Sequence, residues 1–344
     1  MRVLVTGGTG FVGLYSAIAL HRAGHEVCLY VRNVEKMKRV LKPFGVNDLE
    51  YVVGDITHRK SVNKALKNRD ALVHAAAIVN VHAKDARKTV ATNKRGTELV
   101  IGGAAEQGIE RILQVSSVTA LFGTNRSSID ENTPLGDGAY GYGRSKVESD
   151  RYVRKLQDQG APIYTTYPGG VIGPDDPGMS EAVLGLQKCL DDVLLITSSG
   201  IQLIDVRDLA LAHVKILERG GPPDRYVLGG QFFSWEEYAQ LLETLLGKRL
   251  RKVYAPRLLL QGLGMWVDLV NRFIPIDAPV TQEALTYASD WVVVDDSKAM
   301  RELGIEYRDI RETLTDTILW LHDSGHLRRK GLAAKLRSRR KSYR

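Results

Sequence analysis

Short apolar runs alternate with segments of helical period along the first half of the chain. Apolar, β-branched runs at residues 3–5, 27–31, 49–53, 71–74, 112–115 and 163–167 predict six strands. Helical periodicity fills most of the gaps between them, first from Phe11 to a stop at Gly24. Strands that alternate with helices predict an α/β fold with a doubly wound parallel sheet. Ligand sites in such a sheet lie at the carboxyl ends of the strands.

The pattern changes after about Pro168. Turn clusters at residues 173–177 and 220–224 separate helical segments at 180–190, 206–218, 234–246 and 310–324. We therefore expect a first domain over residues 1–167 and a smaller C-terminal α/β subdomain over residues 168–325, interleaved with the edge of the sheet. Residues 326–344 form a separate basic tail.

An apolar segment at residues 258–270 has three interpretations. Asp268 and Arg272 interrupt it, which favours a buried helix over one that dips into a membrane. A cover over an apolar substrate is the third. Large aromatic side chains in this half also hint at a hydrophobic ligand, although core packing explains them equally well. They are Phe232, Phe233, Trp266 and Trp291.

Composition indicates an ordinary globular protein. The 344 residues are 44% hydrophobic and 26% charged, which is enough apolar material for a core. Cys28 and Cys189 match neither metal-ligand nor disulfide-framework spacing, so we expect no metal site and a reducing, cytoplasmic location. The chain from Met1 has no secretory signal pattern, and no run of 18 apolar residues predicts a membrane span.

The formal net charge of +8 belongs to the tail. Residues 326–344 contain nine Lys or Arg and no acidic residue, and the remainder carries 39 basic and 40 acidic side chains. The near-neutral body argues against nucleic-acid binding. For the tail, a solvated terminus and contact with an anionic membrane both remain open.

The first motif with chemical meaning is Thr6-Gly-Gly-Thr-Gly-Phe-Val-Gly13, which follows a predicted strand and opens a predicted helix. Glycines at this spacing permit a tight turn and let backbone N–H groups approach a pyrophosphate at a helix N-terminus. In this context the motif predicts a Rossmann domain that binds a dinucleotide.

The end of the second strand predicts the choice of coenzyme. An acidic residue there would accept the ribose hydroxyls of NAD, but this chain has Arg32, with Lys36 and Arg39 following. A guanidinium suits a 2′-phosphate, so the sequence favours NADP over NAD, with a solvated Arg32 as the alternative.

Two further strand ends contribute to the same site. Gly54-Asp55-Ile56 follows the third strand, where a carboxylate can accept the adenine amino group. His74-Ala-Ala-Ala77 ends the fourth, where small residues let the backbone pass close to the cofactor. We interpret His74 as a packed histidine in preference to a proton carrier.

Tyr142 and Lys146 are four residues apart, so on a helix they share one face. An ammonium beside a phenol favours the phenolate and lowers the phenol's pKa, which makes it usable as an acid or base. Tyr140 is a competitor, but Arg144 four residues later suits the lysine's role less well. Ser117, just after the fifth strand, is our choice for the hydroxyl that holds the substrate oxygen, with Ser116 and Thr119 as alternatives.

These residues together resemble the extended short-chain dehydrogenase/reductase superfamily, whose members are NAD-dependent epimerase/dehydratase-like. The resemblance covers roughly residues 1–325, and Val31-Arg32 with Lys36 looks like the dihydroflavonol-reductase and 3β-hydroxysteroid-dehydrogenase-like branch. Additional marks are Asn93-Lys-Arg-Gly-Thr97, Tyr167-Pro-Gly-Gly-Val-Ile-Gly-Pro174, Asp205-Val-Arg-Asp208 and Tyr226-Val-Leu-Gly-Gly230.

The resemblance implies roles for individual residues. Tyr142 would be the catalytic acid/base, Lys146 its electrostatic partner and Ser117 the hydroxyl that orients the carbonyl. The expected cofactor contacts are Gly7, Thr9, Gly10, Phe11, Val12, Gly13, Arg32, Lys36, Asp55, Ile56, Ala75, Ala76, Ala77, Asn93, Val115, Tyr142, Lys146, Pro168, Gly169 and Val171.

Two features depart from the sugar-modifying relatives. Tyr167 stands where nucleotide-sugar enzymes usually carry Arg, and Val118 and Thr119 replace the acidic pair of dehydratases. We therefore expect an NADP(H)-dependent oxidoreductase that reduces a ketone or aldehyde and reversibly oxidises the alcohol. A nucleotide-sugar epimerase with retained cofactor, and a non-catalytic NADP-binding sensor, are the alternatives. The resemblance also implies a homodimer.

Overall fold

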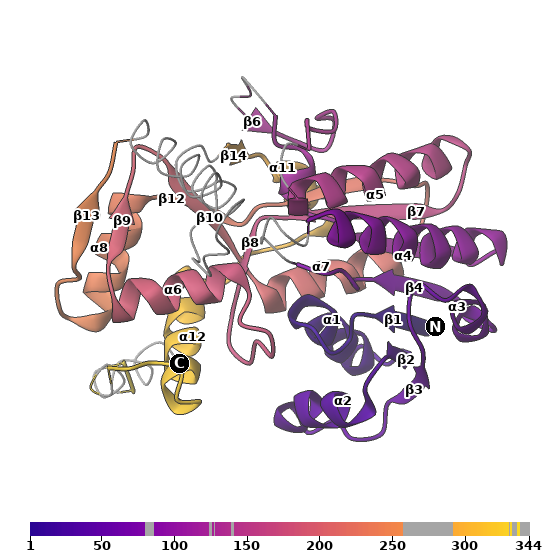
Figure 1. Ribbon diagram of the computed structural model, residues 1–344, viewed down its shortest axis with the longest axis horizontal. Helices are drawn as coiled ribbons and strands as arrows, with labels where there is room; N and C mark the ends of the chain where they lie inside the picture. The colour runs from indigo at the N-terminus through magenta and orange to yellow at the C-terminus, as the bar shows by residue number, and fades with distance from the viewer. Residues whose placement is uncertain are drawn as a thin grey trace.

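The computed structural model describes residues 1–79, 86–123, 126, 128–138, 141–256, 292–329, 331 and 336–337 (Figure 1). Its centre is a parallel sheet of seven strands in the order β11-β7-β5-β4-β1-β2-β3. The strands are β1 (Arg2–Thr6), β2 (Glu26–Val31), β3 (Glu50–Val53), β4 (Ala71–His74), β5 (Arg111–Val115), β7 (Ile163–Pro168) and β11 (Arg225–Leu228). All six strands expected from the sequence are present, each within a residue or two of the predicted bounds.

Alternating side chains along the strands build a core on each face of this sheet. Val3 and Val5 of β1 pack in one core with α1 (Phe11–Arg22) and α7 (Val206–Arg219). Leu4 packs in the other core, with side chains of three helices. These are α3 (Arg59–Leu66), α4 (Ala86–Glu106) and α5 (Gly141–Asp158). Because successive strand residues point to opposite faces, both faces must be covered by helices, and Figure 1 shows the resulting three layers.

The second half of the chain forms smaller sheets beside this core. β8 (Gly170–Ile172), β10 (Gly200–Asp205) and β12 (Gln231–Ser234) make a mixed three-stranded sheet. Two pairs complete the set, β9 (Leu194–Ile196) with β13 (Lys252–Tyr254), and β6 (Ser128–Ile129) with β14 (Val293–Val294). Three helices, α6 (Glu181–Asp191), α8 (Trp235–Leu246) and α12 (Ile310–Asp323), pack around a separate apolar cluster. The α/β class with a smaller C-terminal part is thereby confirmed.

Part of the second half returns to the large sheet. β11 pairs in parallel with β7, and α7 packs against α1. α2 (Val34–Leu41), η1 (Lys42–Phe44), η3 (Val118–Ala120) and α11 (Ser297–Leu303) complete the described elements. The boundary at residue 167 stays a prediction, since strand β11 from beyond it closes the edge of the first domain's sheet.

The described part of the basic tail is packed. Leu327 and Leu336 are buried in the cluster around α12, and Arg328 forms an ion pair with Asp192. These contacts differ from those of a freely solvated terminus. The apolar segment 258–270, together with Trp266 and Trp291, lies outside the described residues. Among the described helices, none has both the length and the apolar character needed to cross a membrane.

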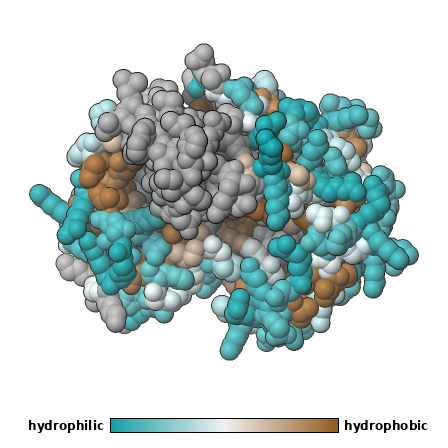
Figure 2. Space-filling model, in the orientation of Figure 1, coloured by the Kyte–Doolittle hydropathy of each residue, from teal (hydrophilic) through white to brown (hydrophobic). Residues whose placement is uncertain are grey.

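The outer faces of α4 and α5 are strongly charged. Exposed side chains there include Arg95 and Lys88 on α4 and Arg144, Arg151 and Lys155 on α5. Figure 2 shows a largely hydrophilic surface over these two helices. A dimer formed through this pair of helices would have to desolvate those charges. The homodimer stays a prediction.

Candidate active site

The glycine turn between β1 and α1 is built for a close backbone approach. Gly7 has φ +76°, and a Cβ there would lie 2.7 Å from backbone atoms of Ala75 and Ala76 at the end of β4. A Cβ at Gly13 would lie 2.4 Å from the Gly7 carbonyl oxygen. Side chains at these two positions would therefore push the turn away from β4 and from the first helical turn.

The N-terminus of α1 is left open for an anion. Its N-cap, Gly10, supplies no side-chain cap, and its first turn has no acidic residue. The backbone N–H groups of Phe11, Val12 and Gly13 belong to that first turn, where intrahelical partners are missing. Together with the helix dipole they fit a pyrophosphate, so a dinucleotide is compatible with this cradle.

His74 is fixed at the end of β4. Its Nδ1 lies 2.7 Å from the Thr6 hydroxyl, and the Ala76 N–H donates to the same hydroxyl at 3.3 Å. Burial, with a smaller contribution from Lys146, lowers the pKa of His74 to about 3. The ring is therefore neutral near pH 7 and a weak base, which agrees with the interpretation of His74 as a packed histidine. Ala75, Ala76 and Ala77 follow it as partly or fully exposed small residues.

Arg32 and Asp55 stand at the ends of neighbouring strands, β2 and β3. Arg32 is exposed directly after β2, and Lys36 lies in the first turn of α2, which Asn33 caps at 2.8 Å. Asp55 Oδ1 accepts hydrogen bonds from Thr57 N–H and Oγ1 at 2.8 and 2.7 Å. These bonds, with the charge of Arg32, lower the pKa of Asp55. Ile56 packs against Gly96 of α4, where a Cβ would lie 2.6 Å away.

Asn93 holds three segments together. Its amide oxygen accepts from Ile78 N–H at 2.8 Å, and its amide nitrogen donates to the Ile78 carbonyl at 2.9 Å. The same nitrogen donates to Ser145 Oγ at 3.1 Å, and Ser145 in turn bonds the Tyr142 carbonyl. Asn93 therefore ties the segment after β4 to the first turn of α5.

Three hydroxyls follow β5, and their hydrogen bonds distinguish them. Ser116 donates to the Asp150 carboxylate at 3.1 Å. Thr119 donates to Ser117 Oγ at 3.0 Å, and the Thr119 N–H donates to the same oxygen at 3.2 Å. Ser117 therefore accepts twice, and among the described residues no acceptor takes its own hydrogen. This geometry favours Ser117 over Ser116 and Thr119 as the hydroxyl that holds a substrate oxygen.

Tyr142 and Lys146 lie on one side of α5, as their spacing predicts. The Lys146 ammonium is 5.8 Å from the centre of the Tyr142 ring and donates to the Val115 carbonyl at 3.1 Å. Lys146 is buried, whereas Tyr142 is partly exposed. Burial lowers the pKa of Lys146 to about 8, against the opposing charge of Asp150. The competitor Tyr140 lies outside the described residues.

The segment after β7 approaches the same edge of the sheet. Pro168 ends β7, and a Cβ on Gly169 would lie 2.7 Å from the Gly229 carbonyl oxygen. Val171 is partly buried in β8 and packs on the cores of both halves. The ends of β1, β4, β5 and β7 thus bring the glycine turn, Ser117, Lys146 and Pro168 to one edge, which is where the predicted site requires them.

Asp150 is a buried group that the sequence analysis missed. It lies one helical turn after Lys146, with Gln114 Nε2 donating to Oδ1 at 2.9 Å and Ser116 to Oδ2. Gln114 and Ser116 are two residues apart at the end of β5, so they share a face of the sheet. Two polar residues at alternate positions of an otherwise apolar strand were the available signal for this cluster.

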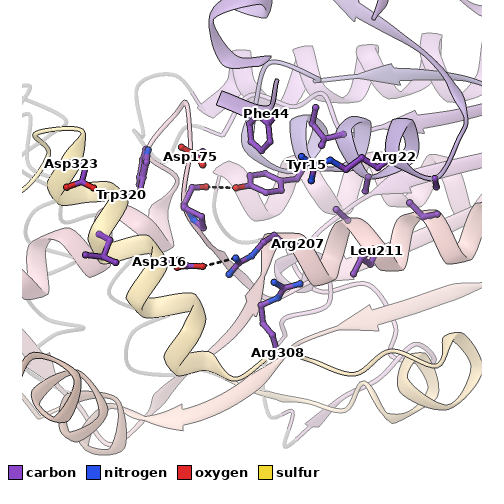
Figure 3. Close-up of a pocket in the computed structure, with 17 residues that line it drawn as sticks. Tyr15, Arg22, Phe44, Asp175, Arg207, Leu211, Arg308, Asp316, Trp320 and Asp323 are labelled. Atoms are coloured by element: carbon purple, nitrogen blue, oxygen red, sulfur yellow. Dashed lines mark hydrogen bonds and ion pairs between the residues drawn. The ribbon is translucent and has the colours of Figure 1, made fainter. Parts of the chain in front are cut away.

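A cavity of about 840 Å³ lies elsewhere, between α1, α7 and α12 (Figure 3). Tyr15, Phe44 and Trp320 contribute aromatic walls. Arg207 at its edge is ion-paired with Asp205 and Asp316 at 2.7 and 2.8 Å. Ser117, Tyr142 and Lys146 do not line this cavity, so it is distinct from the predicted site.

Comparisons with known proteins agree with this architecture. Residues 3–229 match the model of the NAD dependent epimerase/dehydratase family. A putative dihydroflavonol 4-reductase of Synechocystis is 28% identical, over 94% of this chain and 95% of that protein. Sterol demethylase protein B of Methylococcus capsulatus is 25% identical, over 94% of this chain and 99% of that protein.

A solved structure titled "Crystal structure of gox2253" superposes with a TM-score of 0.79 at 26% identity. It covers 95% of this chain and 99% of its own. The family model covers the glycine turn, the Ser117 strand end and the Tyr142–Lys146 helix. The chain belongs to the NAD dependent epimerase/dehydratase family of extended short-chain dehydrogenases/reductases.

Proposed function

We propose that the chain is an NADPH-dependent reductase of a ketone or aldehyde, which oxidises the corresponding alcohol in the reverse direction. The observation that carries the proposal is the hydroxyl arrangement after β5. Ser117 Oγ accepts two hydrogen bonds from Thr119 and keeps its own hydrogen for a substrate oxygen. Lys146 and Tyr142 stand on the facing helix α5.

The residues divide the chemical work in a way that follows from these contacts. When bound, the nicotinamide supplies the hydride that reaches the carbonyl carbon. Tyr142 Oη donates the proton to the carbonyl oxygen, and Ser117 Oγ donates a hydrogen bond that stabilises the developing alkoxide. Lys146, charged and anchored on the Val115 carbonyl, favours loss of the Tyr142 proton.

The preference for NADPH rests on the charges beside the adenosine end of the cradle. Arg32 is exposed at the end of β2, and Lys36 follows in the first turn of α2. A guanidinium and an ammonium at that position complement a 2′-phosphate, which NAD lacks. Asp55, with Oδ1 bonded to Thr57, keeps Oδ2 for the adenine amino group.

The placement of the basic residues disfavours the alternative function, a nucleotide-sugar epimerase. An epimerase holds a substrate diphosphate, for which Arg207, Arg225 and Lys248 are the candidates. Arg207 is already bonded to Asp205 and Asp316. Arg225 begins β11 and is therefore at the end of that strand opposite to the site edge. The non-catalytic sensor is disfavoured because Ser117, Tyr142 and Lys146 are all retained.

The test is a panel of ketones and aldehydes incubated with NADPH and, separately, with NADH. We expect loss of the reduced-nicotinamide absorbance with at least one carbonyl compound, faster with NADPH. Interconversion of a nucleotide sugar without consumption of added coenzyme would instead support the epimerase. Binding of NADPH with neither reaction would support the sensor.

A further inference from the structure

Asp150 is a fully buried carboxylate that takes no direct part in the proposed reaction. It is only 1% exposed and lies on α5, one turn beyond Lys146. Both of its oxygens are engaged by the end of β5, Oδ1 by Gln114 and Oδ2 by Ser116. A carboxylate pinned at two points in this way has a defined position relative to the rest of the helix.

Lys146 is also buried, four residues before Asp150 on the same helix α5. Removing an ammonium from water is unfavourable unless an opposite charge compensates it. Burial lowers the pKa of Lys146, and the negative charge of Asp150 raises it again. Reciprocally, burial raises the pKa of Asp150 to about 6, and Lys146 is among the groups that lower it. At neutral pH the two charges therefore stabilise each other.

The other groups around this pair can be named. Lys146 faces the Tyr142 ring on its own helix, the Val115 carbonyl on β5 and the neutral His74 on β4. Among the described residues, Asp150 is the acidic group that favours the charged lysine.

Asp150 in turn faces cationic and phenolic neighbours. Arg154, one turn further along α5, donates to Tyr167 Oη at 3.2 Å and lowers the pKa of Asp150 through its charge. Tyr167 on β7 also lowers that pKa. These neighbours favour ionised Asp150, so the carboxylate is available to act on Lys146.

We propose that Asp150 is a positioning residue of the active site: anchored by Gln114 and Ser116, it keeps Lys146 charged and its ammonium on the Val115 carbonyl, beside Tyr142. The inference rests on the proposed function, because the charged lysine matters only if Tyr142 transfers a proton. It also explains why Ser116, adjacent to the catalytic serine, is committed to a carboxylate and unavailable to substrate.

The first test is the pH dependence of NADPH-dependent carbonyl reduction. Asp150→Asn removes the compensating charge, so Lys146 should lose its proton at lower pH. The alkaline limb of kcat should then move down by about one pH unit. Asp150→Glu keeps a carboxylate, so the alkaline limb of its pH profile should lie close to that of the unaltered protein. Asp158→Asn, the same change at the exposed end of α5, should leave it in place. An unchanged alkaline limb in folded Asp150→Asn would overturn the proposal.

A second readout does not depend on activity. NMR of protein containing isotope-labelled lysine follows the Lys146 Cε signal, assigned by its loss in Lys146→Arg. In the unaltered protein this signal should show its own titration and a smaller inflection at lower pH, where Asp150 gains its proton. A single-step titration would overturn the proposal even if Asp150→Asn fails to fold.

The two readouts separate the inference from the proposed function. Coupled titration of Lys146 in a protein that reduces no carbonyl would retain the Asp150–Lys146 coupling and reject the reductase. Carbonyl reduction with an uncoupled Lys146 would retain the reductase and reject the role of Asp150.

Discussion

Thr119 and Ser117 share a hydroxyl–hydroxyl hydrogen bond of 3.0 Å in which Thr119 is the donor. The Thr119 N–H donates to the same oxygen, because Ser117 caps the short helix η3. Ser117 thus acts as an acceptor within the protein, and its one hydrogen can point toward a ligand. The adjacent Ser116 has the opposite arrangement, since its hydrogen goes to Asp150.

This difference predicts distinct outcomes for two neighbouring alanine substitutions. Ser117→Ala removes the donor to the developing alkoxide, so we expect kcat/KM to fall by about a hundredfold or more. Ser116→Ala loosens Asp150 but keeps the substrate-binding hydroxyl, so kcat/KM should fall much less than in Ser117→Ala. The free energy of unfolding should fall by about 1–3 kcal/mol, because part of a buried carboxylate is left without a partner. Steady-state kinetics and urea unfolding on both variants check this. A reversed pattern would make Ser116 the substrate-binding hydroxyl.

Tyr142→Phe should separate binding from chemistry. The variant keeps the ring beside Lys146 but lacks the proton that the carbonyl oxygen needs. We expect NADPH affinity, measured by fluorescence titration, to stay within a few-fold of the unaltered protein, while turnover falls by about 10²–10⁴-fold. Tyr152→Phe, on the same helix, provides a matched control. Full turnover in Tyr142→Phe would refute the proton-transfer role.

Much of the fold and part of the site were predictable because their signals are local. The glycine turn and the Tyr142–Lys146 spacing each fall within a single short segment, and periodicity located the strands of the central sheet. β11 is different: β8, β9 and β10 lie between it and β7 along the chain, and no short-range pattern marks Arg225–Leu228 as the partner of β7.

The choice among Ser116, Ser117 and Thr119 shows where sequence reasoning ended. Proximity to the strand end selected all three, but their roles depend on which hydroxyl donates to which acceptor. That assignment requires Asp150, which comes from a helix 34 residues further along the chain than Ser116. The alternation of Gln114 and Ser116 along β5 signals a buried polar cluster, but no spacing pattern identifies a partner this distant in the chain, so the role of Asp150 required the packed structure.

Arg32→Asp tests the choice of coenzyme. The exposed guanidinium after β2 would be replaced by a carboxylate, which repels a 2′-phosphate and accepts ribose hydroxyls. We expect the Kd for NADPH to rise by about tenfold to a hundredfold, in line with the loss of one charge-assisted hydrogen bond, and the Kd for NADH to change little or improve. Arg251→Asp, which makes the same change at another exposed position, controls for net charge. Equal losses for both coenzymes would contradict the 2′-phosphate assignment.

His213 predicts a loss of stability in acid. Its ring is fully buried between Ser16 Oγ at 2.8 Å and Thr166 Oγ1 at 3.2 Å, linking α7 to α1 and β7. Burial lowers the pKa of His213 to about 3 from the ordinary histidine value of 6.5.

Between those two pH values the unfolded chain binds a proton that the folded protein excludes. Stability should therefore fall as the pH drops through this window, with a contribution from His213 of about 1.4 kcal/mol per pH unit. Asp150 acts in the opposite sense below pH 6, since burial raises its pKa and the folded state there binds the extra proton. Urea unfolding between pH 7 and about pH 4.5 measures the sum. His213→Gln should be less stable at pH 7 yet show a shallower pH dependence, whereas His58→Gln, at an exposed position, should keep the slope of the unaltered protein. An unchanged slope in His213→Gln would mean that the buried ring accepts a proton without unfolding.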